Sequence, residues 1–456
     1  MKFLNTSVAI KHLPSLDPGF IPFGAFMNGF LQTAKKPVAI AIYRNDGLVS
    51  VYKTFVHGTP DMAEADRYYA ERLVKFLLWQ KGGAEIVIYG DDEIAAHIAQ
   101  VFRSGGTRAF DADFMAGIYE REFTVRAGVG EPPAENERPM RIGGQMNGCR
   151  IGFDAGGSDR KVSAVIDGEA VYSEEVVWYP KVNGDPSYHY EGILSALETA
   201  ASKMPRVDAI GVSSAGIYVD NRTMAASLFL QVPKDQFEQY AKDIYIRAAA
   251  AIGDVPLLVA NDGDVTALAG AIELKAVDVL GIAMGTSEAA GYIDRDGNIT
   301  GWLNELAFTP IDCQPDAMMD EWSGDIGCGV KYFSQDSVIK LAPRAGIALD
   351  ENASPAEKLK VVQTLMGEGD PRAKQVFESI GVYLGHTLSL YAMFYEIKHV
   401  LLMGRVMSGE GGALIVEHAK RVLREEYPAL KLELHLPDEN SRRVGQSVAA
   451  ASLPIV

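Results

Sequence analysis

The chain has 456 residues, which exceeds an ordinary single domain, so two or three domains are expected. Hydrophobic residues make up 48% and charged residues 23%, as in a soluble globular protein, and no apolar run is long enough to suggest a membrane span. The formal net charge of −17 repels phosphate backbones and predicts that nucleic acid is not a partner. A small phosphate-bearing molecule remains compatible with this charge, because backbone amides and a metal ion can hold it locally.

The three cysteines, Cys149, Cys313 and Cys328, cannot form a disulfide framework, and their number favours a reducing compartment. Cys313 and Cys328 have neither a CxxC spacing nor a nearby histidine pair, so we interpret them as buried thiols. The N-terminus does not resemble a cleavable signal peptide. These features predict a cytoplasmic protein that does not associate with a membrane.

The first 140 residues are predicted to form a small accessory α/β domain. Residues 36–57 alternate as two strands joined by Asn-Asp-Gly, which is a strong hairpin signal. A helix at about 61–80, a buried strand at 84–90 and a helix with an acidic first turn at 91–102 follow. Residues 128–140 are rich in proline and charge, which predicts a linker.

After this linker, one order of elements occurs twice. Hairpins are expected at 150–166 and 277–300, and the first is followed by helices and strands in alternation. The predicted elements are helices at 190–203, 235–252, 265–271, 354–366, 370–395 and 410–425, and strands at 206–216, 255–262, 399–404 and 431–436. The N-terminal elements repeat this order weakly. The pattern predicts a duplicated α/β fold that closes over a cleft, with ligands where loops leave the strand ends.

The tip of the first hairpin carries a carboxylate, two glycines and a hydroxyl. Gly156 and Gly157 permit close backbone approach, so their amides can point at an anion. Asp154 can hold Mg²⁺ through water, and the Ser158 hydroxyl can donate to a phosphate oxygen. The alternative is an ordinary tight turn.

The tip of the second hairpin has the same character. Gly285, Thr286 and Ser287 are small residues that could surround a second phosphate, although a plain turn explains them equally well taken alone. Two such tips in two related lobes strengthen the phosphate interpretation. Glu288 follows directly and would add negative charge near a phosphate.

A polar pair follows the strand at 255–262, where a helix begins at once. Asp262 could accept a proton from a hydroxyl nucleophile, which is the usual complement to charge neutralisation in phosphoryl transfer. The alternative is that Asp262 or Asp264 only caps the helix. A further buried strand runs into Gly404, which could form the floor of a nucleoside pocket or only a strand-to-helix turn.

These motifs resemble the superfamily of sugar kinases, heat-shock ATPases and actin, and most closely the ROK family of sugar kinases and regulators. The resemblance runs from about Arg150 to the C-terminus. The family's DxGGT loop is similar to residues 154–158, its Asn-Asp pair to Asn261 and Asp262, and its second phosphate loop to residues 285–287. Its closing helix resembles residues 445–450.

The resemblance implies two actin-like (ribonuclease H-like) ATPase lobes around a cleft, preceded by the extra α/β domain. The implied domains are residues 141–262 and 263–456, with the C-terminal helix returning to the first lobe. For the accessory domain of residues 1–140, the order of hairpin, helix and strand suggests a degenerate actin-like half as one interpretation. ATP, Mg²⁺ and a sugar hydroxyl are the implied reactants, and a homodimer is a candidate assembly. The implied residues are Asp262 as general base, Asn261, Glu305 and Gly216 for the sugar, and Asp154, Gly156, Gly157, Ser158, Gly285, Thr286, Ser287 and Gly404 for the nucleotide and metal.

The sequence also departs from the family pattern. Glu305 keeps the sugar-binding acid, but Phe308 stands where the family has a histidine that contacts sugar and zinc. Of the family's CxCGxxGC loop only Cys328 remains, so structural zinc is predicted to be absent. A second acid of the family falls on Val330. These changes leave a non-catalytic sugar-sensing or scaffold relative as the alternative function; a repressor is disfavoured because residues 1–145 carry no basic recognition helix.

Overall fold

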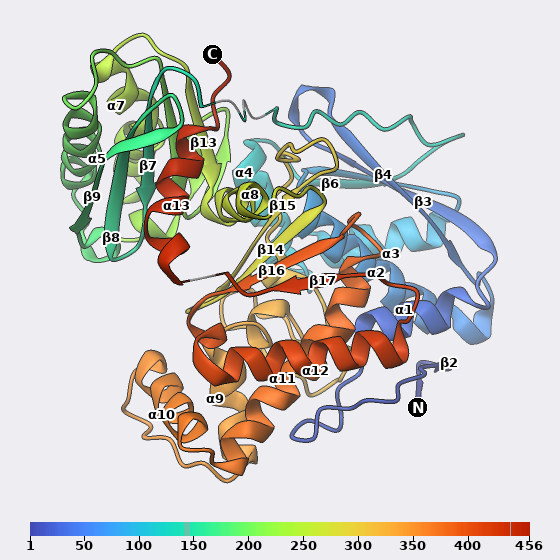
Figure 1. Cartoon of the computed structure of the whole chain (residues 1–456). Helices are drawn as coiled ribbons and strands as arrows, with labels where there is room; N and C mark the ends of the chain where they lie inside the picture. The colour runs from blue at the N-terminus through green and yellow to red at the C-terminus, as the bar shows by residue number, and fades with distance from the viewer. Residues whose placement is uncertain (142–143, 145, 438) are drawn as a thin grey trace. The chain divides into compact units, whose positions relative to one another are not determined.

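The computed structural model describes residues 1–141, 144, 146–437 and 439–456 (Figure 1). The chain divides into two compact units. The first unit comprises Met1–Arg138, Ile282–Ala290 and Trp302–Leu436, and the second comprises Pro139–Gly281, Gly291–Gly301 and Pro437–Val456. The N-terminal segment therefore shares a unit with most of the C-terminal half. The three-domain division with boundaries after residues 140 and 262 stays a prediction.

A five-stranded sheet forms the centre of the second unit. Its order is β13-β10-β7-β8-β9, with β7, β10 and β13 parallel and β8 and β9 added as an antiparallel meander. The bounds are β7 Cys149–Ala155, β8 Asp159–Ile166, β9 Glu169–Val177, β10 Ala209–Ser214 and β13 Leu257–Asn261; a two-stranded ribbon joins β11 Ile217–Val219 to β12 Arg222–Ala225. The predicted hairpin at 150–166 is thus confirmed as β7 and β8.

Side chains that alternate along the strands pack against helices on both faces of this sheet. Ile151 and Phe153 of β7 point into a core with helices α5 (Pro186–Ala201) and α7 (Ile244–Ile252). Gly152, between them, faces the opposite way, and a side chain there would collide with the backbone carbonyl of Ser447 in α13 (Glu439–Ala451). The C-terminal helix α13 and α8 (Asp262–Leu274) therefore cover the second face.

The first unit contains a four-stranded sheet built from the N-terminal segment, in the order β4-β3-β5-β6. Its strands are β3 Lys36–Tyr43, β4 Val49–Val56, β5 Glu85–Tyr89 and β6 Thr124–Ala127, and the helices of this segment are α1 Phe23–Leu31, α2 Ala63–Lys81, α3 Asp92–Phe102 and α4 Ala109–Tyr119. The predicted hairpin at 36–57 and the elements that follow it are confirmed.

A second sheet has the order β15-β14-β16-β17. Its strands are β14 Val279–Met284, β15 Glu288–Ile293, β16 His399–Met403 and β17 Glu433–His435. Helices α9 Gln335–Arg344, α10 Pro355–Gly367 and α11 Pro371–Tyr391 lie between β15 and β16 in the chain, and α12 Gly409–Glu426 lies between β16 and β17. Within the first unit, α11 and α12 pack closely, because Gly385 leaves room for Val422. Among the described residues, no helix combines the length and hydrophobicity that crossing a membrane requires.

Several predicted helices have different bounds in the structure. The helix expected at 190–203 is α5, which begins at Pro186, and the helix expected at 370–395 is α11, which ends at Tyr391. The helix expected at 235–252 is divided into a short turn, α6 (Lys234–Gln236), a π-helical turn (Phe237–Ala241) and α7. The helix expected to begin at Val265 begins at Asp262, and Asn261 is its N-cap, with a side chain that accepts from the Gly263 N–H at 2.7 Å. The capping function that the sequence left to Asp262 or Asp264 therefore belongs to Asn261.

Candidate functional site

Three parallel strands of the second unit end level with one another. Ala155 of β7 pairs with Ser214 of β10, which pairs with Asn261 of β13. One step earlier, Asp154 pairs with Ser213. Because the carboxyl ends of parallel strands form one edge of a sheet, this register brings the two predicted motifs, at 154–158 and 261–262, to the same edge.

Asp154 is a buried carboxylate with little compensating charge. Its Oδ1 accepts from the Ser213 hydroxyl at 2.9 Å, and its Oδ2 lies 3.9 Å from Nζ of Lys161. Burial raises the pKa of Asp154 to about 7, since Lys161 and Ser213 only partly offset desolvation and the nearby Asp262 adds negative charge. A cation beside this carboxylate would therefore be stabilised.

The loop after β7 is held by the residues around it. The Gly156 carbonyl accepts from Nε1 of Trp178 at 2.7 Å, and the Ser158 hydroxyl donates to Asp159 Oδ2 at 3.0 Å. A Cβ on Gly157 would lie 2.6 Å from Cε and 3.0 Å from Nζ of Lys181, so the end of this lysine side chain lies directly against the glycine. The glycines thus allow a cation to approach the backbone closely.

Asp262 opens helix α8 next to its N-cap. The Gly263 N–H donates to Asp262 Oδ1 at 3.0 Å. Burial raises the pKa of Asp262, while the Gly263 amide and the positive charge of Lys181 oppose this rise. A carboxylate with a raised pKa can act as a general base if a hydroxyl comes within hydrogen-bond reach.

Lys181 is the residue that sequence reasoning missed. It lies in a single 3-10 turn, Pro180–Val182, after β9, and its side chain is exposed. Its ammonium lies near Gly157 and close enough to Asp262 to affect that carboxylate electrostatically. Among the described residues it has no hydrogen-bond or ion-pair partner. No sequence motif identifies Lys181, because its position beside the loop 156–158 depends on the path of the chain after β9.

The C-terminal helix contributes to the same edge. Nε2 of Gln446 donates to Ser213 Oγ at 3.0 Å and to the backbone oxygen of Asp262 at 3.3 Å. Asn261 is used in a similar way, with its Nδ2 donating to the Gly216 carbonyl at 2.7 Å. The structure therefore brings together Asp154, Asn261, Asp262 and Gly216, whose roles in binding stay predictions.

In the first unit, the loop 285–287 joins β14 to β15. The Gly285 N–H donates to the Ser287 carbonyl at 2.9 Å, and the Gly285 carbonyl accepts from the Gln335 N–H at the start of α9, also at 2.9 Å. A Cβ on Gly285 would meet no atom nearer than 3.7 Å, and Thr286 and Ser287 are exposed. The space next to Gly285 is therefore open, so a ligand could approach the backbone of this loop closely.

Glu288 turns away from that loop into the first unit. It is 3% exposed; its Oε1 accepts from the Tyr391 hydroxyl at 3.4 Å, and its Oε2 has no hydrogen-bond partner among the described residues. Burial raises its pKa to about 8, and the negative charge of Glu305 adds to the rise. A side chain at Gly329 would collide with Oε2. Burial thus favours the neutral form of this carboxyl group, which lies beside Gly329.

Phe308 belongs to an aromatic cluster. Its ring centroid lies 4.4 Å from that of Trp79 and 5.0 Å from that of Trp322. Glu305, three residues earlier, is half-buried, and its backbone N–H donates to the Trp79 carbonyl at 3.0 Å. Helix α2 of the N-terminal segment therefore positions the stretch that carries both residues.

Residues 321–328 are held by an ion cluster. Asp325 lies 2.8 Å from Arg72 Nη1, 3.0 Å from Lys75 Nζ and 2.6 Å from Arg108 Nη1. These three cations outweigh the effect of burial and hold the pKa of Asp325 well below its usual range. Cys328 lies beside this cluster, with Sγ 3.4 Å from Asp325 Oδ2. Cys313 and Cys328 are buried and free, as the sequence predicted, and Cys149 is also buried and free.

Gly404 follows β16 with a φ of +96°, a conformation that favours glycine. A side chain there would collide with the Met284 carbonyl at the end of β14. Close packing of the two strands explains this glycine without a ligand. Its predicted place in a nucleoside pocket stays a prediction.

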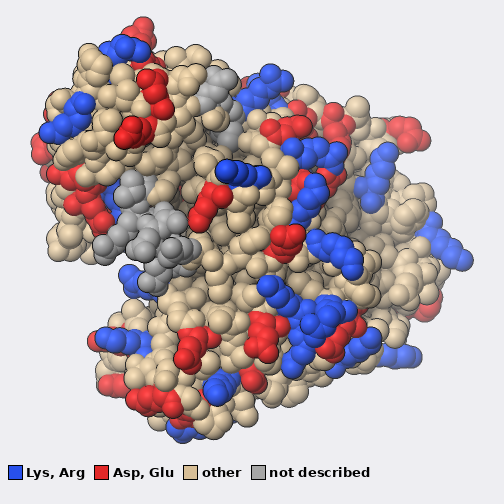
Figure 2. All heavy atoms as spheres, in the orientation of Figure 1, with Lys and Arg blue, Asp and Glu red and all other residues tan. Residues whose placement is uncertain are grey.

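Figure 2 shows acidic and basic side chains interspersed over the face that it draws. On that face, no large patch carries charges of one sign alone. This charge distribution does not test the prediction that nucleic acid is not a partner.

No protein-family model and no curated protein matches the chain. Among solved structures, the ROK hexokinase from Thermus thermophilus matches with a TM-score of 0.53 and 19% identity, over 67% of this chain and 97% of that chain. A ROK-family transcriptional regulator, described as a homologue of the Escherichia coli MLC protein, matches with a TM-score of 0.52 and 17% identity, over 67% of this chain and 78% of that chain. At these identities the likeness shows the fold, and it confirms the predicted fold class: over about two-thirds of its length the chain has the α/β fold of the ROK-family sugar kinases and regulators.

Proposed function

We propose that the chain is a ROK-family enzyme that transfers the γ-phosphoryl group of ATP to a hydroxyl of a sugar or sugar derivative. The observation that carries this proposal lies within the second unit. Asp154 lies at the carboxyl end of β7 and Asp262 directly follows β13, with β10 between these two parallel strands. Lys181, which has no hydrogen-bond or ion-pair partner among the described residues, lies next to both Gly157 and Asp262. Two carboxylates with raised pKa values, a glycine loop and a free ammonium form a suitable set for phosphoryl transfer.

In this mechanism Asp262 takes the proton of the attacking sugar hydroxyl. Its raised pKa favours this step, because proton transfer is most effective when the pKa of the base approaches the working pH. The Asn261 side chain holds Gly216 and caps α8, which fixes the backbone around the base. Sugar-binding roles for Asn261, Gly216 and Glu305 follow from the family resemblance.

Asp154 fits a magnesium site. A buried carboxylate that lacks full compensation, with a second carboxylate close by, is suited to Mg²⁺, which usually binds one or two carboxylates together with phosphate oxygens and water. When bound, Mg²⁺ neutralises charge on the phosphates. Ser213 orients Asp154 for this purpose through its hydrogen bond.

Lys181 neutralises the phosphoryl group in the proposed mechanism. Its ammonium already lies over the backbone of Gly157, where the amides of the loop would bind phosphate. A lysine acts on phosphate as a flexible point charge, so it can follow the group as it moves. Gly285, Thr286 and Ser287 are the proposed contacts to the remaining phosphates, and Gly404 to the nucleoside.

A second candidate is a non-catalytic protein that senses a sugar or serves as a scaffold. It is favoured by the similarity in fold to a ROK transcriptional regulator and by Phe308 and Val330, which replace polar residues of the family. Titration calorimetry separates the two functions. A kinase must bind ATP or ADP in the presence of Mg²⁺, whereas a sugar sensor need not.

The decisive experiment is a screen of sugars and amino sugars with ATP and Mg²⁺, read by release of ADP. We expect at least one acceptor to give turnover that depends on Asp262. The matched control is the Asp262→Asn variant, which should fold and bind nucleotide but lose turnover. Nucleotide binding without turnover on any acceptor would favour the second candidate, and turnover that Asp262→Asn leaves unchanged would overturn the assigned base.

A further inference from the structure

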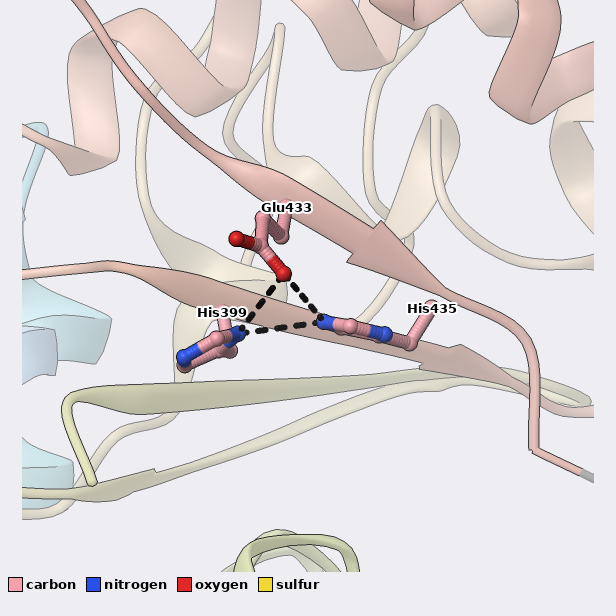
Figure 3. Close-up of side chains that lie close together, drawn as sticks. All are labelled: His399, Glu433 and His435. Carbon is pink, nitrogen blue, oxygen red and sulfur yellow. Dashed lines mark hydrogen bonds and ion pairs between the residues drawn. The ribbon is translucent and has the colours of Figure 1, made fainter. Parts of the chain in front are cut away.

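Three side chains outside the proposed kinase site meet on two neighbouring strands of the first unit. Strands β16 and β17 run parallel, and His399 pairs with Glu433 while Leu401 pairs with His435. Residues 433 and 435 are two apart on one strand, so their side chains lie on the same face. Figure 3 shows the two imidazole rings and the carboxylate directed toward one another on that face.

The distances among the three donor atoms are those of a metal-binding group. His399 Nδ1 lies 3.1 Å from His435 Nε2 and 3.6 Å from Glu433 Oε2, and the third distance, from His435 Nε2 to Glu433 Oε2, is 3.9 Å. Ligands at the usual zinc distances of about 2.0–2.2 Å in a tetrahedron are separated by roughly 3.3–3.6 Å. A single ion therefore fits between the three atoms with only small movements of the side chains.

We propose that His399, Glu433 and His435 form a binding site for a divalent transition-metal ion, with Zn²⁺ as the best match. Two imidazoles and one carboxylate are ligands that Zn²⁺ accepts readily, whereas Mg²⁺ and Ca²⁺ prefer oxygen ligands throughout. The two histidines are partly exposed and Glu433 is largely exposed, so an ion can enter from solvent. A water molecule would complete the tetrahedron.

The site has a structural consequence in the first unit. Strand β17 is only three residues long and lies at the edge of its sheet, with β16 as its sole partner in the described sheet. An ion bound by one residue of β16 and two of β17 would connect these strands in addition to their backbone hydrogen bonds. Since binding to the folded chain alone adds to the free energy of unfolding, Zn²⁺ should stabilise this edge.

A hydrogen bond between the two imidazoles is the competing explanation of their 3.1 Å contact. That bond would need only the histidines and would not involve Glu433. The ammonium of Lys420, on α12, lies close enough to affect His435 electrostatically and would oppose a cation. The two explanations therefore predict different effects of changing Glu433 and Lys420.

The test is a titration of the metal-free full chain with Zn²⁺, followed by calorimetry and by the melting temperature. We expect one Zn²⁺ per chain at this site and a melting temperature that rises with Zn²⁺. The variants His399→Ala and His435→Ala should lose this binding, Glu433→Gln should weaken it about tenfold or more, and Lys420→Gln should tighten it. His12→Ala is the matched control, because His12 is about as exposed as the two histidines and pairs with Glu425, but is not part of a cluster of three ligand side chains among the described residues.

Substitution with Co²⁺ identifies the ligands independently of stability. The expected absorption spectrum has the visible bands of a low-coordinate nitrogen and oxygen site and no thiolate charge-transfer band, so that binding by a cysteine would be recognised. A wild-type chain that binds no Zn²⁺ would overturn the proposal, as would Glu433→Gln, His399→Ala and His435→Ala variants that bind like the wild type. The proposal does not depend on kinase activity, and none of these measurements requires a sugar or ATP.

Discussion

Two buried carboxylates of this protein differ in how their charge is compensated. Asp154, in the second unit, has one ammonium at 3.9 Å and one hydroxyl donor, and its pKa is raised to about 7. Asp325, in the first unit, has three cations within 3.0 Å, and its pKa is lowered. Burial is common to both, so the supply of positive charge decides the difference.

This difference distinguishes a site that can bind a cation or a substrate from a site that stabilises the fold. A carboxylate with too little compensation gains free energy from an additional cation or proton, which a substrate complex can provide. A carboxylate with full compensation gains nothing more, but the removal of its charge leaves its buried cationic partners with less negative charge around them. We therefore expect changes near Asp154 and Asp262 to affect turnover and changes near Asp325 to affect folding.

The largest expected effect on turnover comes from Asp262→Asn. Loss of the general base should lower kcat by about 10²–10⁴-fold, because the amide cannot accept the proton of the sugar hydroxyl. Folding and nucleotide binding should be retained, since the N-cap of α8 is Asn261. Steady-state kinetics together with calorimetry check this result. A variant that loses nucleotide binding as severely as turnover would place Asp262 in binding instead of proton transfer.

The counterpart in the first unit is Asp325→Asn. Removal of this charge leaves Arg72, Lys75 and Arg108 without their shared carboxylate and should reduce the free energy of unfolding by about 3–5 kcal/mol. Urea denaturation measures the change. The control is Asp316→Asn at an exposed position, which should stay within about 0.5 kcal/mol of the wild type. Equal stability of the two variants would contradict a structural role for the cluster.

An intermediate effect is expected for Lys181→Met. Loss of one positive charge next to the transferred group should lower kcat by roughly 10–10³-fold with little change in stability, since the exposed side chain has no ion-pair partner among the described residues. Lys234→Met, at another exposed lysine of the second unit, is the control and should leave kcat unchanged. If both variants behave alike, Lys181 has no part in transfer.

The last prediction is a pH dependence of stability, to which Glu288 contributes without any effect on turnover. Its pKa is raised from 4.5 to about 8 in the folded chain, so between these values the folded state keeps a proton that the unfolded state loses. The free energy of unfolding should therefore fall as pH rises through this range, by at most about 1.4 kcal/mol per pH unit from this group. Denaturation of Glu288→Gln at several pH values checks this prediction. The neutral amide should make the profile flatter above pH 4.5, and an unchanged slope would contradict it.

Much of the local structure follows from short-range patterns. The hairpin at 36–57 could be predicted because Asn45, Asp46 and Gly47 join two alternating segments, and Asp46 and Gly47 indeed have positive φ. The break in the helix expected at 235–252 could not be predicted, because a π-helical turn such as Phe237–Ala241 has no sequence signal as specific as Asn-Asp-Gly. Patterns of this kind report the local backbone and little else.

Most of the strands and helices, the resemblance to ROK-family motifs and the placement of Asp154 and Asp262 at strand ends could be predicted from the residue pattern. Which charges meet could be known only from the folded chain. Lys181 lies over Gly157, Glu288 turns inward toward Tyr391, and Asp325 gathers cations from the distant N-terminal segment. The physical reason is that periodicity and turn preferences act over a few residues, whereas burial and charge compensation depend on neighbours far apart in the chain.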